Sequence, residues 1–362
     1  PAMMACLAAA ASVTLGLCLP MMVAGPFWPA APFVAIPMPI PLSMLVSVLM
    51  PILTSCLSAV VAIQESCPDV LREILFVDDG SADRTRDLVE RHPVTLIAGS
   101  GQGPGAARNL GWKAATSSLV WFVDSDCVAH PEALETLLPH FDDSFVGAVS
   151  GTYGNASEDS LLGCLIHEEI VERHHRMSRE VDFLATFNVI YRRTILQELE
   201  GFDERYLKAQ DAELSFRTRA AGHRLHFEME SVVDHYHEQR LRSYLKTQRQ
   251  QGYWRVWLHL EHPGHAAKNS YSGALDHLQP IVAMGVLGSE VLWFLPFGWS
   301  VTVLLVILLL AMQIPMTISL MKRTRQSRLV MFAAMSSVRS VWRGIGLTHG
   351  VLAFAFRRKV RS

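Results

Sequence analysis

The sequence is short of charge and of paired cysteines, and each shortage excludes a class of protein. Only 18% of its 362 residues are charged and the net charge is −2, so there is no overall attraction for nucleic acid. The six cysteines form no CxxC pair and no zinc-ligand spacing, and scattered cysteines are typical of a reducing compartment. With 50% hydrophobic residues the chain is too apolar for a purely soluble enzyme and too charged for a polytopic transporter. A soluble domain with attached membrane segments is the best fit.

The amino-terminal region, residues 1–42, has no charge at all, because the first charged residue of the chain is Glu65. Residues 3–24 are apolar and long enough to span a bilayer, but they lack the basic region that begins a signal peptide. The proline-rich stretch GPFWPAAPFVAIPMPIP that follows is typical of an extended linker. Residues 3–24 are therefore either a membrane span or an unstructured terminus.

Residues 271–328 are predicted to form a transmembrane hairpin. The apolar runs 281–295 and 299–320 are separated by Pro296-Phe297-Gly298 and are together too long for one span. Four basic residues follow and mark the cytoplasmic side: Lys322, Arg323, Arg325 and Arg328. A hairpin would put the preceding domain on that same side. Residues 329–362 are predicted to form an amphipathic, interfacial segment.

Two short apolar runs that resemble buried strands each end in a pair of carboxylates. The runs are 73–77 and 119–123, and the acids that follow them are Asp78, Asp79, Asp124 and Asp126. Like charges held this close repel each other unless a cation lies between them. The spacing of Asp124 and Asp126 therefore indicates a site for a divalent metal.

The same region alternates strands with helices. A strand at 94–98 and a helix at about 105–116 separate the two acidic pairs, and another helix is predicted through 87–90. Such alternation predicts an α/β fold with a mostly parallel sheet flanked by helices, with the ligand at the carboxyl ends of the strands. Both acidic pairs would then face one crevice.

The glycine-rich turn after the strand at 94–98 also matches a dinucleotide-binding fingerprint. Gly101-x-Gly103-x-x-Ala106 lies between a strand and a helix, and Asp124 is near the position of a ribose-binding acid. Against an NAD-binding oxidoreductase, the turn follows an earlier strand–acid–helix unit, the later acid is doubled, and Arg108 projects from the first helical turn.

Taken in order, several segments of the chain resemble family-2 glycosyltransferases of the membrane-anchored bacterial type. The segments are EILFVDDGSADRT, GQGPGAARNLGWKAA, VWFVDSD, FLATFNVIYRRTIL, LEGFDERYLKAQDAELSFRTRAAGHRLHF and VVDHYH. The resemblance implies a GT-A, Rossmann-like fold for residues 43–270, followed by carboxy-terminal transmembrane helices.

The resemblance also assigns roles to residues. It implies that the nucleotide is bound by Asp78, Asp79, Arg108 and Asp124. It implies that Mg²⁺ or Mn²⁺ is held by Asp126, and by a histidine such as His235 or His237. A hard cation that takes oxygen ligands and bridges phosphates agrees with this.

Asp211 matches the family's base, which takes the proton from the acceptor hydroxyl and gives inversion at the anomeric carbon. Asp211 as a simple helix cap is the alternative. Gln210 departs from the glutamate common in the family, and Asn188 matches a polar stretch beside the acceptor site. At the amino end, 46–50 resembles the family's first strand, but the turn at 52–55 lacks the expected polar residues.

The sequence thus predicts a metal-dependent, inverting glycosyltransferase at the inner (plasma) membrane, with its catalytic domain in the cytoplasm. The predicted donor is a nucleotide-sugar, most simply a UDP-sugar, and the predicted acceptor is a lipid-linked or polysaccharide glycan of the cell envelope. A catalytically degenerate member that only binds nucleotide is the first alternative, since Gln210 and the turn at 52–55 depart from the pattern.

Overall fold

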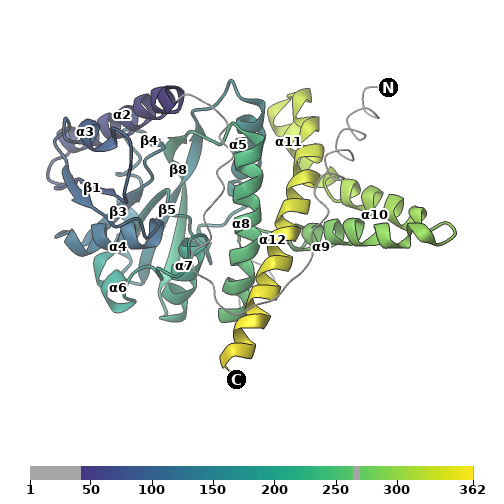
Figure 1. Ribbon diagram of the computed structural model, residues 1–362. Coiled ribbons are helices and arrows are strands. Elements are labelled where there is room, and N and C mark those ends of the chain that lie inside the picture. Colours follow the sequence, from purple (N-terminus) through teal and green to yellow (C-terminus); the bar gives the residue numbers. More distant parts are fainter. Residues whose placement is uncertain (1–41, 264–269, 362) are drawn as a thin grey trace. The chain divides into compact units, whose positions relative to one another are not determined.

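The computed structural model describes residues 42–263 and 270–361, and the arrangement of their helices and strands is drawn in Figure 1. The predicted amino-terminal segment, residues 1–42 with its candidate span at 3–24, lies almost wholly outside the described residues.

The strands form two sheets. They are β1 (Leu75–Asp78), β2 (Thr95–Ala98), β3 (Leu119–Val123), β4 (Cys127–Ala129), β5 (Val146–Asn155), β6 (Glu180–Val181), β7 (Asn188–Arg192) and β8 (Arg224–His235). β1 and β2 pair in parallel as a separate two-stranded sheet. The other six form a sheet in the order β3-β7-β5-β8-β4, with β6 paired to β8.

The α/β class is confirmed, but the prediction of a mostly parallel sheet is wrong. In the six-stranded sheet only β5 and β8 are parallel, and every other pair is antiparallel. A parallel pair needs a crossover, usually a helix, between its strands. The alternation of strand and helix supplies such a crossover between β1 and β2 through α3 (Thr85–Val89), but it does not continue regularly beyond β3.

The cores of this α/β part come from the apolar strands. One cluster of side chains packs the fully buried residues Tyr191 of β7 and Leu225 of β8 with Leu196 and Leu214, which lie on helices. The strand predicted at 119–123 matches β3, and the helix predicted at 105–116 is α4 (Pro104–Ala114).

The first strand predicted at 46–50 is wrong, because those residues begin α2 (Leu42–Ser66). The buried residues of this helix, Leu53, Cys56, Leu57 and Ile63, recur at helical spacings and form one apolar face. Ile63 packs into the core beside β4, and Leu53 and Leu57 pack against Val89. The buried residues between Leu53 and Ile63 follow the spacing of a helix, and this helix begins before the predicted strand at 46–50.

Helices alternate with β6, β7 and β8 from residue 161 on, and after β8 the described part of the chain has helices and no further strand. The α-helices of this region are α5 (Leu161–His174), α6 (Arg193–Glu198), α7 (Gln210–Ala220), α8 (Leu241–Glu261), α9 (Ala274–Gly288), α10 (Trp299–Ala311), α11 (Ile314–Thr324) and α12 (Phe332–Arg361). Helices α8 and α12 pack closely: a Cβ built on Gly346 would lie 2.0 Å from the carbonyl oxygen of Arg249. Only glycine lets two helix backbones approach so near at this crossing.

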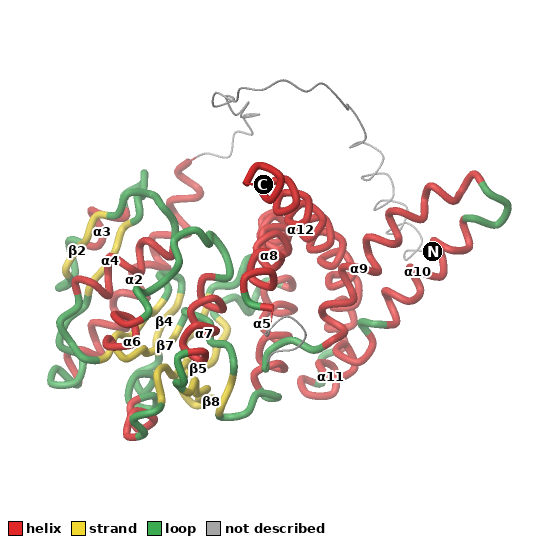
Figure 2. Tube along the Cα trace, turned by 90° about the horizontal axis from the view of Figure 1, so that it is seen from below, coloured by secondary structure: helices red, strands yellow, loops and turns green. Residues whose placement is uncertain are grey.

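α9 and α10 form a helical hairpin, with its two arms side by side in Figure 2. The apolar run predicted at 299–320 is divided between α10 and α11. Among the described residues one stretch, Trp299–Thr324, is long and apolar enough to cross a membrane, with 26 residues and a mean hydropathy of 2.5 over an 18-residue window. A single stretch of this kind does not establish a membrane protein, because core helices of soluble proteins meet the same criterion. α11, its second half, is tied to α5 through ion pairs of Arg323 with Glu168 and Glu172.

Arg339, the first arginine of α12, faces other helices. Arg339 is 4% exposed and forms an ion pair with Glu169 of α5, which is itself buried. Arg173 binds Glu169 at 2.7 Å and Asp276 of α9 at 2.7 Å. This buried ionic network joins α5, α9 and α12.

Lowering the pH is expected to weaken this network. Burial acts to raise the pKa of Glu169, but Arg339 and Arg173 outweigh it and lower the pKa from 4.5 to about 2. The carboxylate therefore contributes stability that is complete above about pH 4.5 and is lost as the pH falls toward 2, on the order of 3 kcal/mol. Urea unfolding at about pH 6 and about pH 3 measures the loss. Glu169→Gln should flatten this part of the pH dependence, and an unchanged slope would contradict the assignment.

Candidate active site

Strand pairing brings the second acid of the DxD motif to the histidine predicted as its partner. Cys127, at the start of β4, pairs with His235, the last residue of β8, and the backbone carbonyl of Asp126 accepts a hydrogen bond from Tyr236. The Asp126 Oδ2 and His235 Nε2 atoms are 3.3 Å apart. Burial acts to raise the pKa of Asp126, but His235 outweighs it and lowers the pKa below its usual value.

These residues fit a divalent cation. Ligand atoms of Asp126, Cys127 and His235 lie within 4.8 Å of one another, the one such group among the described residues. The buried Cys127 thiol has its pKa raised by desolvation and by both acids of the motif, so it stays protonated and is no ligand for a hard cation. The carboxylate and the imidazole are the groups suited to hold Mg²⁺ or Mn²⁺.

The first acid of the motif lies against the arginine predicted to contact the nucleotide. Arg108 on α4 donates from Nη2 to Asp124 Oδ1 at 2.7 Å. Its other terminal nitrogen, Nη1, is buried and has no hydrogen-bond partner within the described ranges. Burial raises the pKa of Asp124 more than Arg108 lowers it. Arg108 thus has one donor engaged in positioning and one available to a ligand.

The earlier acidic pair is engaged in holding backbone. Asp78 accepts a hydrogen bond from Ser81 N at 2.9 Å and forms an ion pair with Arg86. Asp79 accepts from the backbone N–H groups of Gly101 at 2.9 Å and Gly103 at 2.7 Å. Asp79 therefore fixes the glycine turn that starts α4, and α4 in turn carries Arg108.

This geometry weighs against the dinucleotide alternative. In that fingerprint the N–H groups of the glycine turn and the helix amino terminus bind a pyrophosphate. Here the carboxylate of Asp79 accepts those N–H groups, including that of Gln102 at 3.3 Å. A second anion would have to compete with the Asp79 carboxylate for the same donors.

Asp211 lies in the first turn of α7, on the side of the molecule that carries the DxD motif. Its carboxyl is desolvated, which raises its pKa, while Ala212 N–H at 2.8 Å and Arg108 lower it and Asp124 raises it. The charges of Arg108 and Asp124 thus act on the predicted base. A carboxylate with a raised pKa is a stronger base than an ordinary aspartate, as general-base catalysis requires.

Gln210 precedes Asp211 and is 7% exposed. Its amide oxygen Oε1 is buried and accepts no hydrogen bond from the part of the chain that the structure describes. An unpaired buried acceptor is costly, so a further donor at this oxygen would be stabilising.

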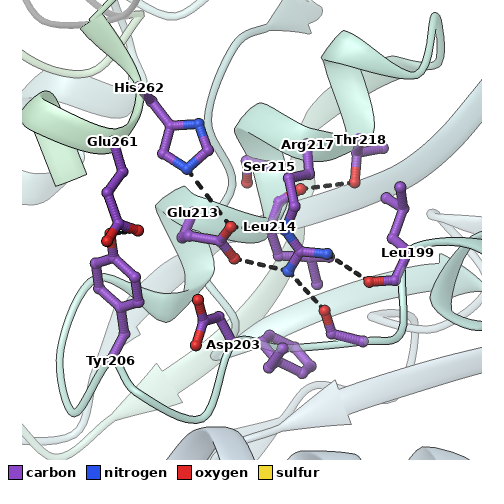
Figure 3. A network of polar contacts seen from close by, with 12 residues as sticks. Leu199, Asp203, Tyr206, Glu213, Leu214, Ser215, Arg217, Thr218, Glu261 and His262 are labelled. Atoms are coloured by element: carbon purple, nitrogen blue, oxygen red, sulfur yellow. Dashed lines mark hydrogen bonds and ion pairs between the residues drawn. The ribbon is translucent and has the colours of Figure 1, made fainter.

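A polar network that sequence reasoning missed holds α7 in place, as Figure 3 shows. Glu213 is buried and receives two hydrogen bonds of 2.6 Å from Arg217, one to each carboxylate oxygen. The same guanidinium donates to the carbonyl oxygens of Leu199 at 2.5 Å and Gly201 at 2.6 Å. The network fixes the helix that carries Asp211 to the loop before it. The spacing of four residues was the signal in the sequence.

Glu213→Gln is expected to lower the free energy of unfolding by about 2–4 kcal/mol, because it leaves the Arg217 guanidinium partly buried without its counter-charge. Chemical unfolding measures this loss. Glu204→Gln, which changes an acid of the preceding loop, is the matched control and should cost less than about 1 kcal/mol. Equal losses in the two variants would contradict the role given to Glu213.

Asn188 is not where the resemblance predicted it. It is fully buried at the start of β7, donates to Ser231 Oγ at 3.0 Å and accepts from Trp121 Nε1 at 2.9 Å. With both ends of the amide satisfied inside the sheet, it is unable to reach an acceptor molecule. Its role is to join β3, β7 and β8.

Two further histidines adjoin His235. The Nδ1 atoms of His235 and His237 are 2.9 Å apart, and His237 Nε2 is 3.2 Å from His167 Nδ1 on α5. His237 is 3% exposed. The resemblance gave His235 and His237 as alternative metal ligands. His235 is the one beside Asp126, and His237 contacts the other ring nitrogen of His235.

The chain matches known proteins over this same region. A sequence model of the family described as Glycosyl transferase family 2 matches residues 50–200. The pre-mycofactocin glycosyltransferase of Mycobacterium tuberculosis is 28% identical over 55% of this chain and 45% of its own length. Glycosyltransferase AglE of Haloferax volcanii is 27% identical over 52% of this chain and 66% of its own length. The chain therefore spans less than two thirds of either relative.

Among solved structures, the mannosyltransferase PcManGT of Pyrobaculum calidifontis, in complex with GDP-Man and Mn²⁺, superimposes with a TM-score of 0.47. It is 17% identical and the match covers 79% of this chain and 83% of that chain.

Proposed function

We propose that this chain, whose residues 50–200 match the sequence model of glycosyl transferase family 2, is a member of that family and a metal-dependent inverting glycosyltransferase that takes its sugar from a nucleotide-sugar, most simply a UDP-sugar. The observation that carries the proposal is the convergence of the Asp126–His235 pair, the Arg108–Asp124 pair and the desolvated Asp211.

Each group has a task in such a transfer. Asp126 and His235 would hold Mg²⁺ or Mn²⁺, which supplies positive charge to the leaving diphosphate. Arg108, with Nη1 unpaired within the described residues, would donate to the base or phosphate of the donor. Asp211 would accept the proton of the attacking hydroxyl, and Gln210 would orient that hydroxyl through Oε1.

We also propose that the acceptor is membrane-associated, a lipid-linked or envelope glycan, and that the α9–α10 hairpin dips into the cytoplasmic leaflet of the plasma membrane. At about 1.5 Å per residue α10 is only ~20 Å long, too short for a hydrocarbon core of ~30 Å. The tip is apolar and exposed, with Phe294 at 93% and Phe297 at 78%. Exposed aromatic residues in one patch are typical of a membrane-contacting surface.

A single charge at the tip tests this mode of binding. Phe294→Asp is expected to lower the fraction of protein that co-sediments with phosphatidylcholine vesicles several-fold, because the carboxylate must be taken out of water. Phe145→Asp, at an exposed phenylalanine of the α/β part, is the control and should leave binding unchanged. Equal binding by all three proteins would contradict insertion of the tip.

The second candidate, a member that binds nucleotide without turnover, is favoured by two observations. The expected first strand is part of α2, and the Asp79 carboxylate already accepts hydrogen bonds from backbone N–H groups.

The experiment that tests the proposal is release of nucleoside diphosphate from a panel of nucleotide-sugars by purified protein with Mn²⁺. Release from one donor supports a transferase; binding of nucleotide without release from any donor, with the acceptor supplied as a membrane extract, favours the second candidate.

A further inference from the structure

A cluster of cations between α8, α9 and α12 has too few anions around it. Four guanidinium groups and two carboxylates meet there: Arg173, Arg255, Arg339, Arg343, Glu169 and Asp276. Arg173 and Arg339 hold both carboxylates in ion pairs. Arg255 and Arg343 therefore have no ion-pair partner of their own within the described ranges.

The side chains of this cluster share a face by helix periodicity. Gly252, Arg255 and His259 are spaced by three and four residues along α8. The crossing with α12 lies at Gly252, where a Cβ would be 2.2 Å from the Arg343 carbonyl oxygen. The His277 ring, in the first turn of α9, is 5.9 Å from the His259 ring. Three helices thus direct donors to one region.

Several buried polar atoms of this cluster have no hydrogen-bond partner in the part of the chain that the structure describes. Both ring nitrogens of His259 and Nε2 of His277 are buried and lack a hydrogen-bond partner among the described residues. Arg343 donates only to neutral amides, Gln248 at 2.6 Å and Gln251 at 3.2 Å. Burial lowers the pKa of Arg255 more than the nearby Asp276 raises it, and burial lowers the pKa of His259 to about 4. A guanidinium nevertheless stays charged, so the cluster favours an anion.

We propose that Arg255, Arg343, His259 and His277 bind the phosphate group of an anionic lipid. Guanidinium groups present paired N–H donors that match phosphate oxygens. The choice of a lipid rests on the hairpin insertion proposed above. His277 lies in the first turn of α9, at the end of the hairpin away from its tip, and the tip residues Phe294 and Phe297 lie beyond the ~17 Å rise from His277 to Gly288. When the tip is inserted, the cluster therefore lies on the side of the hairpin that faces the headgroups and the aqueous phase.

The test uses the full chain with two probes and EDTA present, so that the metal-dependent donor site does not contribute. Pyrophosphate is titrated calorimetrically, and co-sedimentation is measured with phosphatidylcholine vesicles with and without phosphatidic acid. The variants are Arg255→Gln and Arg343→Gln, and the matched control is Arg242→Gln, an exposed arginine on the same helix. We expect phosphatidic acid to increase vesicle binding of the wild type and of Arg242→Gln. In each cluster variant this increase should be at least tenfold smaller than in the wild type.

The possible outcomes distinguish the source of the phosphate, the existence of the site and the insertion of the hairpin. Pyrophosphate binding that weakens in the cluster variants, together with no gain from phosphatidic acid, overturns the lipid as the source and leaves a site for soluble phosphate. Unchanged binding of both probes in the cluster variants overturns the site. Arg255→Gln should melt at the same temperature as the wild type or higher in phosphate-free buffer, since it removes an uncompensated charge; a clear drop would make Arg255 structural. Phe294→Asp reports on the hairpin separately, because it leaves pyrophosphate binding intact if only insertion fails.

Discussion

Asp211→Asn is expected to lower the rate of sugar transfer about 10²- to 10⁴-fold while leaving metal-dependent nucleotide binding unchanged. The amide keeps the size and the hydrogen bond to Ala212 N–H, which donates to Oδ1 at 2.8 Å, but it is unable to take a proton. Transfer of labelled sugar measures the rate, and calorimetry with UDP measures binding. Asp159→Asn, at an exposed acid, is the control and should retain full activity.

The pH dependence of transfer gives a second test of Asp211. Desolvation raises the pKa of this carboxyl, so the base becomes protonated at a higher pH than an ordinary aspartate. The rate should therefore fall, as the pH is lowered, above the range in which exposed aspartates titrate. The N-cap of α7 is Ala209, so Asp211 is not a helix cap. If Asp211 only supports the first turn of α7, the Asn variant should transfer sugar at nearly the wild-type rate, because asparagine still accepts the Ala212 N–H.

Asp126→Asn is expected to weaken Mn²⁺-dependent binding of UDP at least about 100-fold and to abolish turnover, because it removes the charged oxygen ligand of the pair. Isothermal titration with and without Mn²⁺ measures the change. Asp234→Asn is a close control, since Asp234 precedes His235 on β8 but pairs with His130 at 3.1 Å. A control variant that lost as much affinity as Asp126→Asn would show that charge near the site, rather than ligation, determines binding.

The sequence was most informative where chemistry and local pattern coincide. The apolar run at 119–123 is followed by Asp124 and Asp126. The run predicted strand β3, and the two acids predicted that the end of this strand lies at the site. The juxtaposition of Asp126 with His235 was implied only by the family resemblance, because it depends on pairing between β4 and β8, about a hundred residues apart.

Where the sequence failed, long-range packing decided the outcome. Residues 46–50 carry strand-forming side chains, but the apolar face that continues to Ile63 makes them part of a helix. The family resemblance placed Asn188 beside the acceptor site, whereas its amide bridges three strands. The buried partner of Arg339 lies 170 residues earlier in the chain, at Glu169, and no local spacing reveals it.

Titration calorimetry of UDP with the wild-type protein tests whether Asp126 and His235 hold a metal that binds the nucleotide. We expect UDP to bind with Mn²⁺, EDTA to remove this binding, and NAD not to bind under either condition. UDP binding that persists in EDTA would contradict the role of Asp126 and His235. Binding of NAD in place of UDP would contradict the assignment of the donor site and favour the glycine turn at 101–103 as a dinucleotide site.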